Sequence, residues 1–171
     1  MPASPHDLFA RLDELGIAHQ TIEHPPLFTV EDSQKLRGDI PGAHIKNLFV
    51  KDKKGRIFLL VAEEDAVIDL KKVHELIGAQ GRVSFVSGER MEEIWGVKPG
   101  AVTPFGAIND TDGLVTVILE AGVMRDRLIN AHPLVNTMTT AISSDDLERF
   151  LKAENHAPHI ITFATQQSVT A

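Results

Sequence analysis

The sequence predicts a single α+β domain with a mixed, strongly curved β-sheet flanked by helices. Two observations lead to this fold class. Two apolar runs, 44–50 and 56–61, are separated by a lysine-rich turn that contains Gly55, a pattern typical of a central β-hairpin. Around this hairpin, helical and strand patterns alternate irregularly, without the strict strand–helix repeat of a parallel sheet.

The segment before the hairpin contains two predicted helices and one strand. Apolar residues recur at helical spacing from Asp7 to Leu15, and Gly16 ends that helix. A short strand is expected over 17–23. Residues 29–32 have the form of a helix capping box, which predicts a short helix to about Arg37.

The segment after the hairpin contains three predicted helices and five predicted strands. Asp69 is a suitable helix cap and Gly78 a suitable helix end. The loop 97–106 is bracketed by prolines and glycines. Helices are expected over 69–78, 87–95 and 144–154, and strands over 82–86, 107–108, 114–119, 136–142 and 159–163.

Length and composition indicate one soluble domain. The 171 residues, 43% hydrophobic and 24% charged, are enough for a single core, which we expect over about 8–163, with 164–171 as a frayed tail. No apolar run approaches the roughly 20 residues of a membrane span. The N-terminal segment has no secretory pattern and the chain has no cysteine, so we expect a cytoplasmic protein without membrane contact.

The charge of the chain limits how it can bind nucleic acid. A net charge of −7 argues against a protein that coats nucleic acid, and no DNA partner is expected. A local basic cluster is nevertheless present. It comprises Lys35, Arg37, Lys46, Lys51, Lys53, Lys54 and Arg56, with Lys71, Lys72 and Arg82 further on. Lys53 and Lys54 are best explained as solvated turn residues, so any contact should be small.

Several kinds of active site have no support in the sequence. The eight histidines form neither HxH nor HExxH, and no metal is expected. No GxSxG elbow, GxxxxGK[ST] phosphate loop or GxGxxG dinucleotide motif is present. The sequence therefore predicts neither a serine hydrolase nor nucleotide chemistry, and no cofactor.

Three weaker signals remain. Lys46 and Asn47 lie inside an apolar strand, where charged and amide groups are costly unless they are used. The loop from Gly100 to Pro104 can bring backbone amides close to a carbonyl or phosphate. His132 precedes a proline and therefore lies in an extended or turn segment.

Each signal also has a structural explanation. Lys46 can extend to the sheet margin and Asn47 can cap a loop. The Gly-x-x-x-Pro segment can be an ordinary turn, and His132 a satisfied structural histidine. Four apolar side chains that could line a small pocket are equally suited to the core: Leu27, Phe28, Val97 and Phe105.

Taken together, these motifs resemble the prolyl-tRNA editing family, the YbaK-like domain. The segment 44–49 with its lysine-rich turn, the loop 100–104 and the segment 130–133 occur in the family's order and spacing. The resemblance extends from about Leu8 to Phe163. The chain has no room for a synthetase catalytic core, so it is most similar to free-standing ProX-type proteins, which remove alanine from proline tRNA.

The resemblance implies a role for each motif. Lys46 would hold the phosphate near the terminal adenosine, and Asn47 would hydrogen-bond the aminoacyl end or its ribose. Backbone amides of the loop that begins at Gly100 would orient the ester and the attacking water, and His132 would line the aminoacyl pocket. The expected substrate-binding residues are Ala101, Val102, Thr103, Pro104, Phe28 and Thr29. The expected tRNA-binding residues are Lys46, Lys51 and Arg82.

The implied activity is metal-free, substrate-assisted hydrolysis of mischarged alanyl-tRNA(Pro), with a ribose hydroxyl assisting the water. The partners would be the acceptor end of that tRNA and prolyl-tRNA synthetase. Three alternatives stay open: a cysteinyl-tRNA(Pro) deacylase, a non-catalytic module that binds the acceptor end, and an unrelated small-molecule hydrolase. One conflict also remains, because Lys46 and Asn47 would point to opposite faces of a regular strand.

Overall fold

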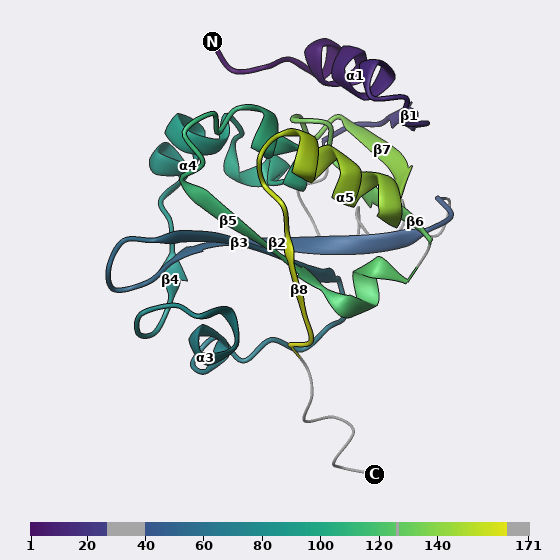
Figure 1. Ribbon diagram of the computed structural model, residues 1–171. Helices are drawn as coiled ribbons and strands as arrows, with labels where there is room; N and C mark the ends of the chain where they lie inside the picture. The colour runs from purple at the N-terminus through teal and green to yellow at the C-terminus, as the bar shows by residue number, and fades with distance from the viewer. Residues whose placement is uncertain (27–39, 126, 164–171) are drawn as a thin grey trace.

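The computed structural model describes residues 1–26, 40–125 and 127–163, in which a mixed β-sheet lies between a thick and a thin layer of helices and loops (Figure 1). The α-helices are α1 (Pro5–Glu14), α3 (Val73–Ile77), α4 (Gly88–Trp95) and α5 (Ser144–Ala153). The strands are β1 (Gln20–Glu23), β2 (Ala43–Lys51), β3 (Ile57–Glu63), β4 (Ser84–Phe85), β5 (Val115–Glu120), β6 (Leu128–Ala131), β7 (Met138–Ser143) and β8 (His159–Ile161). Short 3₁₀ helices are η1 (Pro99–Ala101), η2 (Pro104–Ile108) and η3 (Ala121–Met124).

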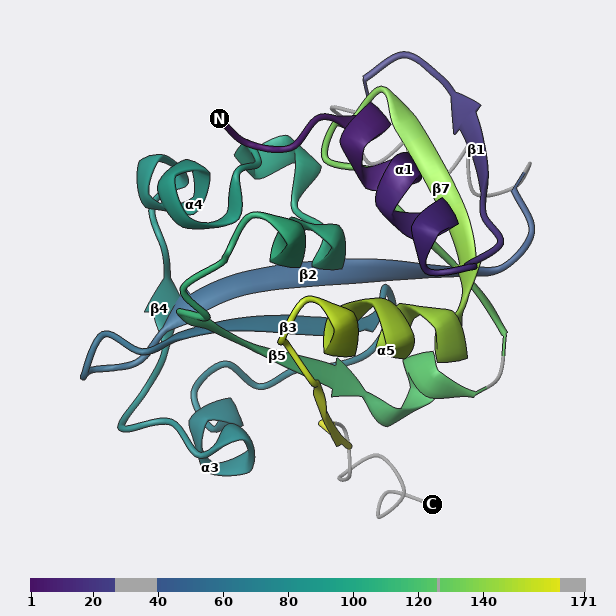
Figure 2. The same ribbon diagram turned by 45° about the horizontal axis from the view of Figure 1, so that its top comes forward.

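The sheet has the order β1-β7-β6-β2-β3-β5-β8, with β4 paired to β2. The β2–β3 and β6–β7 pairs are antiparallel, whereas β2–β6 and β3–β5 are parallel, so the predicted mixed sheet is confirmed. The long strand β2 joins two halves of the sheet, because Ala43 and His44 pair with β6 and the remainder pairs with β3. Figure 2 shows that β7 crosses the direction of β2 steeply, which gives the sheet its bend.

The predicted central hairpin is formed by β2 and β3. Its turn is held by Asp52, whose buried carboxylate accepts hydrogen bonds from the backbone N–H groups of Lys54, Arg56 and Gln80 at 2.8–2.9 Å. Burial alone would raise the pKa of Asp52, but these backbone donors outweigh it and hold the pKa below its ordinary value of 3.8. The turn is therefore stabilised by an ionised carboxylate.

Apolar residues pack on both faces of the hairpin. The larger core lies under α1, α4, α5 and η2, and includes Trp95, Phe105 and Phe150, each fully buried. The smaller core lies on the opposite face, where Phe58 and Leu60 pack against α3 and Phe163. Alternate residues of the hairpin strands therefore enter different cores.

The structure corrects several element predictions. The expected strand at 107–108 is part of the 3₁₀ helix η2, because Pro104 begins that helix and the Thr103 side chain caps it. Strand β6 lies in a segment for which no element is predicted; with only four residues it owes its strand form to its neighbours β2 and β7. The α-helix expected over 69–78 is shorter in the structure, where α3 covers only Val73–Ile77. Strand β7 begins at Met138, two residues after its predicted start at residue 136. The helix predicted over 29–37 lies outside the described residues.

Candidate functional site

The Lys-Asn pair of β2 is divided between the two faces of the sheet, as the alternation of a regular strand requires. Lys46 pairs with Ala62 and Asn47 with Val61 in an unbroken ladder. The Lys46 ammonium donates a hydrogen bond to the Ala66 carbonyl, beyond the end of β3. Asn47 points to the other face, where its Nδ2 donates to the Val102 carbonyl at 3.2 Å. Asn47 is therefore joined to the predicted loop, and the Lys46 ammonium is bonded elsewhere.

The Asn47 amide has a second feature that bears on ligand binding. Its Oδ1 is buried and has no hydrogen-bond partner among the described residues. A buried acceptor without a partner costs about 1–3 kcal/mol. Such a group is uncommon in a folded interior, and a ligand that donated to it would recover that cost.

The loop from Gly100 to Pro104 is anchored from beneath by the core. Trp95 is fully buried, and its Nε1–H donates to the Thr103 carbonyl at 2.7 Å. Thr103 is also fully buried, and its hydroxyl accepts from the Phe105 N–H at 3.3 Å. A side chain at Gly106 would meet the Trp95 ring, with a Cβ only 2.2 Å from its atoms, so the indole fits directly against the backbone. The loop position therefore depends on Trp95.

Only part of this loop is available to a ligand. Gly100 is exposed and Val102 is partly exposed, whereas Ala101 and Pro104 are buried. The Ala101 N–H is already used, because it donates to the Lys98 carbonyl at 2.8 Å. The surface that the loop presents is thus formed by Gly100 and Val102.

Gly100 is bordered by a residue from a distant segment, Asn136. The Asn136 Nδ2 lies 3.3 Å from the position that a Cβ would occupy on Gly100. No other described residue, apart from the chain neighbours of Gly100, places an atom within 4 Å of that position. The segment that connects β6 to β7 therefore forms one wall beside the loop.

His132 lies in the same connection as Asn136. Its Nδ1 is 2.9 Å from the Met138 carbonyl, which can only accept a hydrogen bond, so Nδ1 carries the proton and Nε2 is left as an acceptor in the neutral ring. Burial lowers the pKa of His132 below 6.5; the Met138 hydrogen bond opposes this change and neighbouring His24 adds to it. His132 is therefore neutral at pH 7.

His24 is a further member of this polar region. Its ring centroid lies 6.3 Å from that of His132. Its Nε2 is 2.8 Å from the Thr139 hydroxyl, and its backbone N–H donates to the Thr137 carbonyl at 2.9 Å. These contacts continue the β1–β7 pairing and fix the imidazole beside the β6–β7 connection.

The two other predicted tRNA-binding cations lie near the far end of β2, away from the start of the strand. Lys51 pairs with Ser84, and Arg82 precedes that residue by two positions. Both cations are exposed. Lys51 and Arg90 line an open cavity of about 360 Å³ between the hairpin turn and α4. Part of the predicted basic cluster, Lys51 and Arg82, therefore lies at this end of the sheet.

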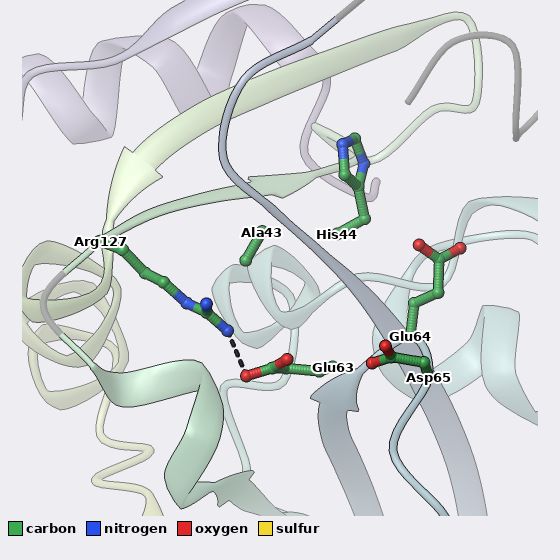
Figure 3. A pocket seen from close by; sticks show the side chains of 6 residues that line it. All are labelled: Ala43, His44, Glu63, Glu64, Asp65 and Arg127. Carbon is green, nitrogen blue, oxygen red and sulfur yellow. Dashed lines mark hydrogen bonds and ion pairs between the residues drawn. The ribbon is translucent and has the colours of Figure 1, made fainter. Parts of the chain in front are cut away.

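A second polar depression, of about 200 Å³, lies near the start of β2 (Figure 3). Arg127 points toward Glu63 and forms an ion pair with it, and it also donates to the Gly122 carbonyl at 3.1 Å. The remaining lining residues are Ala43, His44, Glu64 and Asp65. Since Asp65 directly precedes Ala66, this depression and the Lys46 ammonium share the segment that follows β3.

The structure thus brings together some of the predicted site residues and adds others. Asn47 meets the loop, and Gly100 meets the connection that contains His132. Phe28 and Thr29 lie outside the described residues. Trp95, Asn136 and His24 were not predicted; the only sequence signal for Asn136 is its position four residues after His132. In the described ranges, no three His, Asp or Glu side chains are grouped to hold a metal, and no helix is long and apolar enough to cross a bilayer.

Fold and site together define the class of this protein, a single mixed α+β domain with a polar site beside a Gly-x-x-x-Pro loop. Comparison with known proteins gives the family: residues 24–150 match the family model of the aminoacyl-tRNA editing domain, and the chain belongs to this family.

Relatives cover nearly the whole chain. It is 37% identical over 150 residues to the prolyl-tRNA editing protein ProX of Acetoanaerobium sticklandii, covering 87% of this chain and 91% of that one. It is 34% identical to the prolyl-tRNA synthetase associated domain-containing protein 1 of Danio rerio, covering 94% and 90% of the two chains. A crystal structure provisionally described as a trans-editing enzyme for prolyl-tRNA synthetase superposes with a TM-score of 0.72 at 17% identity, covering 96% of this chain and 98% of that one. At that identity the superposition supports the fold alone.

Proposed function

We propose that this protein is a trans-editing deacylase that hydrolyses the ester of mischarged alanyl-tRNA(Pro) without a metal or cofactor. The observation that carries the proposal is the hydrogen bond from Asn47 to the Val102 carbonyl, which joins two motifs 55 residues apart in the chain. The family membership and the similarity to a prolyl-tRNA editing protein support the same reaction class. The protein would act in the cytoplasm as one editing domain, alone or bound to prolyl-tRNA synthetase.

The loop would orient the ester. Because the Ala101 N–H is bonded to Lys98, the proposed donors to the ester carbonyl are the backbone amides of Gly100 and Val102. Thr103 and Pro104, which the sequence suggested as substrate-binding residues, would hold the loop in place through their burial rather than touch the substrate. The free Oδ1 of Asn47 would accept a hydrogen bond from a ribose hydroxyl.

Lys46 would bind the phosphate of the terminal adenosine. In an aminoacyl-adenosine the phosphate and the ester are attached to opposite sides of the ribose, so their binding groups need not converge on one face of the sheet. The Lys46 ammonium would exchange its hydrogen bond with the Ala66 carbonyl for the phosphate. This would place Lys46 and Asn47 in one substrate complex.

The reaction needs a water, a base and a stabilised carbonyl. A ribose hydroxyl of the tRNA would assist the attacking water, since no charged side-chain base is expected in the site. The neutral imidazole of His132, with Nε2 as an acceptor, would position that water or the amino acid. The alcohol of the ribose leaves and the amino acid is released as a carboxylate.

Editing is needed because a synthetase site for proline cannot strongly reject the smaller alanine, where each missing methylene changes binding by only about 1–3 kcal/mol. A second site that admits alanine and excludes the proline ring corrects this error. Cysteine is also small enough to be a substrate of such a site, so cysteinyl-tRNA(Pro) is the alternative ester. Lys51 and Arg82 would contact the tRNA phosphates beyond the acceptor end.

The proposal is tested with alanyl-tRNA(Pro) and three forms of the protein: wild type, Lys46→Ala and Lys71→Ala. Lys71 is an exposed lysine outside the proposed site and controls for loss of one positive charge. We expect rapid ester hydrolysis by the wild type and by Lys71→Ala, and a fall in kcat/KM of at least tenfold for Lys46→Ala. Binding of tRNA without hydrolysis by the wild type would refute the enzyme and favour a binding module.

A further inference from the structure

The space above Gly100 is open and has one polar group at its edge. The Asn136 Nδ2 is the only atom within 4 Å of the Cβ position of Gly100, chain neighbours aside and within the described residues. The Asn136 side chain is partly exposed, and its amide forms no hydrogen bond with any described residue. An amide offers a donor and an acceptor at once. A ligand that approaches the Gly100 backbone therefore meets a free hydrogen-bonding group.

The turn that carries Asn136 is rigidly held. Leu134 has a φ of 73°, which side-chain-bearing residues rarely adopt. It persists because the Leu134 side chain is buried in the larger core and its N–H donates to the His132 carbonyl at 2.9 Å. The His132 hydrogen bond to Met138 closes the turn from the other side. Strain that the surrounding packing maintains is a feature of functional sites.

The charge of the substrate determines what Asn136 can bind. An alanyl ester carries an α-ammonium, which donates hydrogen bonds and needs acceptors. The proposed loop amides are donors, and the two other acceptors of the site, Asn47 Oδ1 and His132 Nε2, are assigned in the proposed complex to a ribose hydroxyl and to the attacking water. The partly exposed amide of Asn136 lies beside Gly100, where the ester is proposed to lie, and rotation of this amide would present its Oδ1 to the ammonium.

From this arrangement we propose that Asn136 is a specificity-determining residue, whose Oδ1 accepts a hydrogen bond from the α-ammonium of the aminoacyl ester bound at Gly100. This inference rests on the proposed function and adds the group that recognises the amino end of the substrate. It makes the β6–β7 connection one wall of the aminoacyl site. Esters that lack the ammonium lose this contact.

The test compares two esters of the same tRNA, alanyl-tRNA(Pro) and propionyl-tRNA(Pro), in which a hydrogen replaces the ammonium and no donor is left at that position. Values of kcat/KM are measured for wild type, Asn136→Ala, Asn136→Asp and Thr137→Ala, each corrected for the spontaneous hydrolysis of its ester. Thr137 is the exposed neighbour of Asn136 and serves as the matched control. Circular dichroism and melting temperature verify that each variant is folded.

We expect Asn136→Ala to lower kcat/KM for the alanyl ester by about 10- to 100-fold, the range for a hydrogen bond to a charged group, and for the propionyl ester by less than about twofold. Asn136→Asp keeps an acceptor of the same shape, so it should keep the preference for the alanyl ester even if the alanine variant folds poorly. Thr137→Ala should leave both esters unchanged.

Two results would overturn the inference. In the first, the wild type is active, but Asn136→Ala lowers kcat/KM by the same factor for both esters or leaves both unchanged. Asn136 then does not recognise the ammonium, although deacylation itself stands. If the wild type hydrolyses neither ester faster than buffer does, the proposed function fails and this inference fails with it.

Discussion

Replacing Trp95 by phenylalanine should uncouple the loop from the core. The substitution keeps an aromatic ring in the cluster but removes the Nε1–H that donates to the buried Thr103 carbonyl at 2.7 Å. An unpaired buried carbonyl costs about 1–3 kcal/mol, and the smaller ring adds a void beside Gly106. For a chain of 171 residues each kcal/mol lowers Tm by about 2–4 °C, so we expect a fall of about 4–8 °C for a loss near 2 kcal/mol.

The same substitution should lower activity more than its effect on folding explains. Under conditions where Trp95→Phe is fully folded, we expect kcat/KM for alanyl-tRNA(Pro) to fall about tenfold, because roughly 1.4 kcal/mol of misplaced loop contacts gives that factor. Phe58→Leu is the matched control, since Phe58 is equally buried but packs in the smaller core on the other face. It should lower Tm and keep the wild-type rate.

The assays are thermal unfolding followed by circular dichroism, and release of labelled alanine at a temperature at least 15 °C below the lowest Tm. An unchanged Tm for Trp95→Phe would refute the stabilising role of the indole hydrogen bond. A lowered Tm with full activity would show that the loop does not need Trp95 to hold its active position.

Three further predictions follow from single contacts. Asn47→Asp places a carboxylate against the Val102 carbonyl in place of a donor, so its kcat/KM should be at least tenfold lower than that of the wild type. The kcat/KM of Asn47→Ser should fall by less, and equal rates for the two variants would contradict the contact. Because burial lowers the pKa of His132 below 6.5, the acidic limb of the pH–activity profile, where the ring gains a proton, should have its midpoint below pH 6.5; a midpoint above pH 6.5 would contradict this assignment. Since the pKa of Asp52 is lowered in the folded state, its stabilising effect is present above its ordinary value of 3.8 and is lost as pH falls through the folded value. Urea unfolding should therefore show Asp52→Asn less stable than wild type at pH 7, with a smaller difference at pH 3, and an equal difference at both pH values would contradict it.

Local patterns predicted the parts of the fold that depend on neighbouring residues. The alternation of apolar residues and the turn near Gly55 were enough to locate the hairpin, and the same alternation predicted that Lys46 and Asn47 lie on opposite faces. Strand β6 was missed because four residues carry little periodicity and its form comes from two partner strands. The strand expected at 107–108 failed because the helix-starting proline before it outweighs a short apolar run.

The candidate site was predicted in its motifs but not in its supports. Asn47 and the loop could be named from sequence, whereas the bond between them depends on how η1 packs above β2. Trp95 contacts residue 103, which follows it after a turn of the chain, and Asn136 approaches residue 100 from a distant segment. No spacing in the sequence encodes such contacts, because they arise only when the sheet and the helical layer are assembled.

The most direct test of the account is a panel of three esters, alanyl-, cysteinyl- and prolyl-tRNA(Pro), each followed by release of its labelled amino acid. The account predicts that wild type hydrolyses the alanyl ester fastest and hydrolyses the prolyl ester no faster than buffer does. Faster release of cysteine would keep the chemistry and change the substrate. Hydrolysis of all three esters at similar rates, or of none, would contradict the claim that this domain removes a wrong amino acid from proline tRNA.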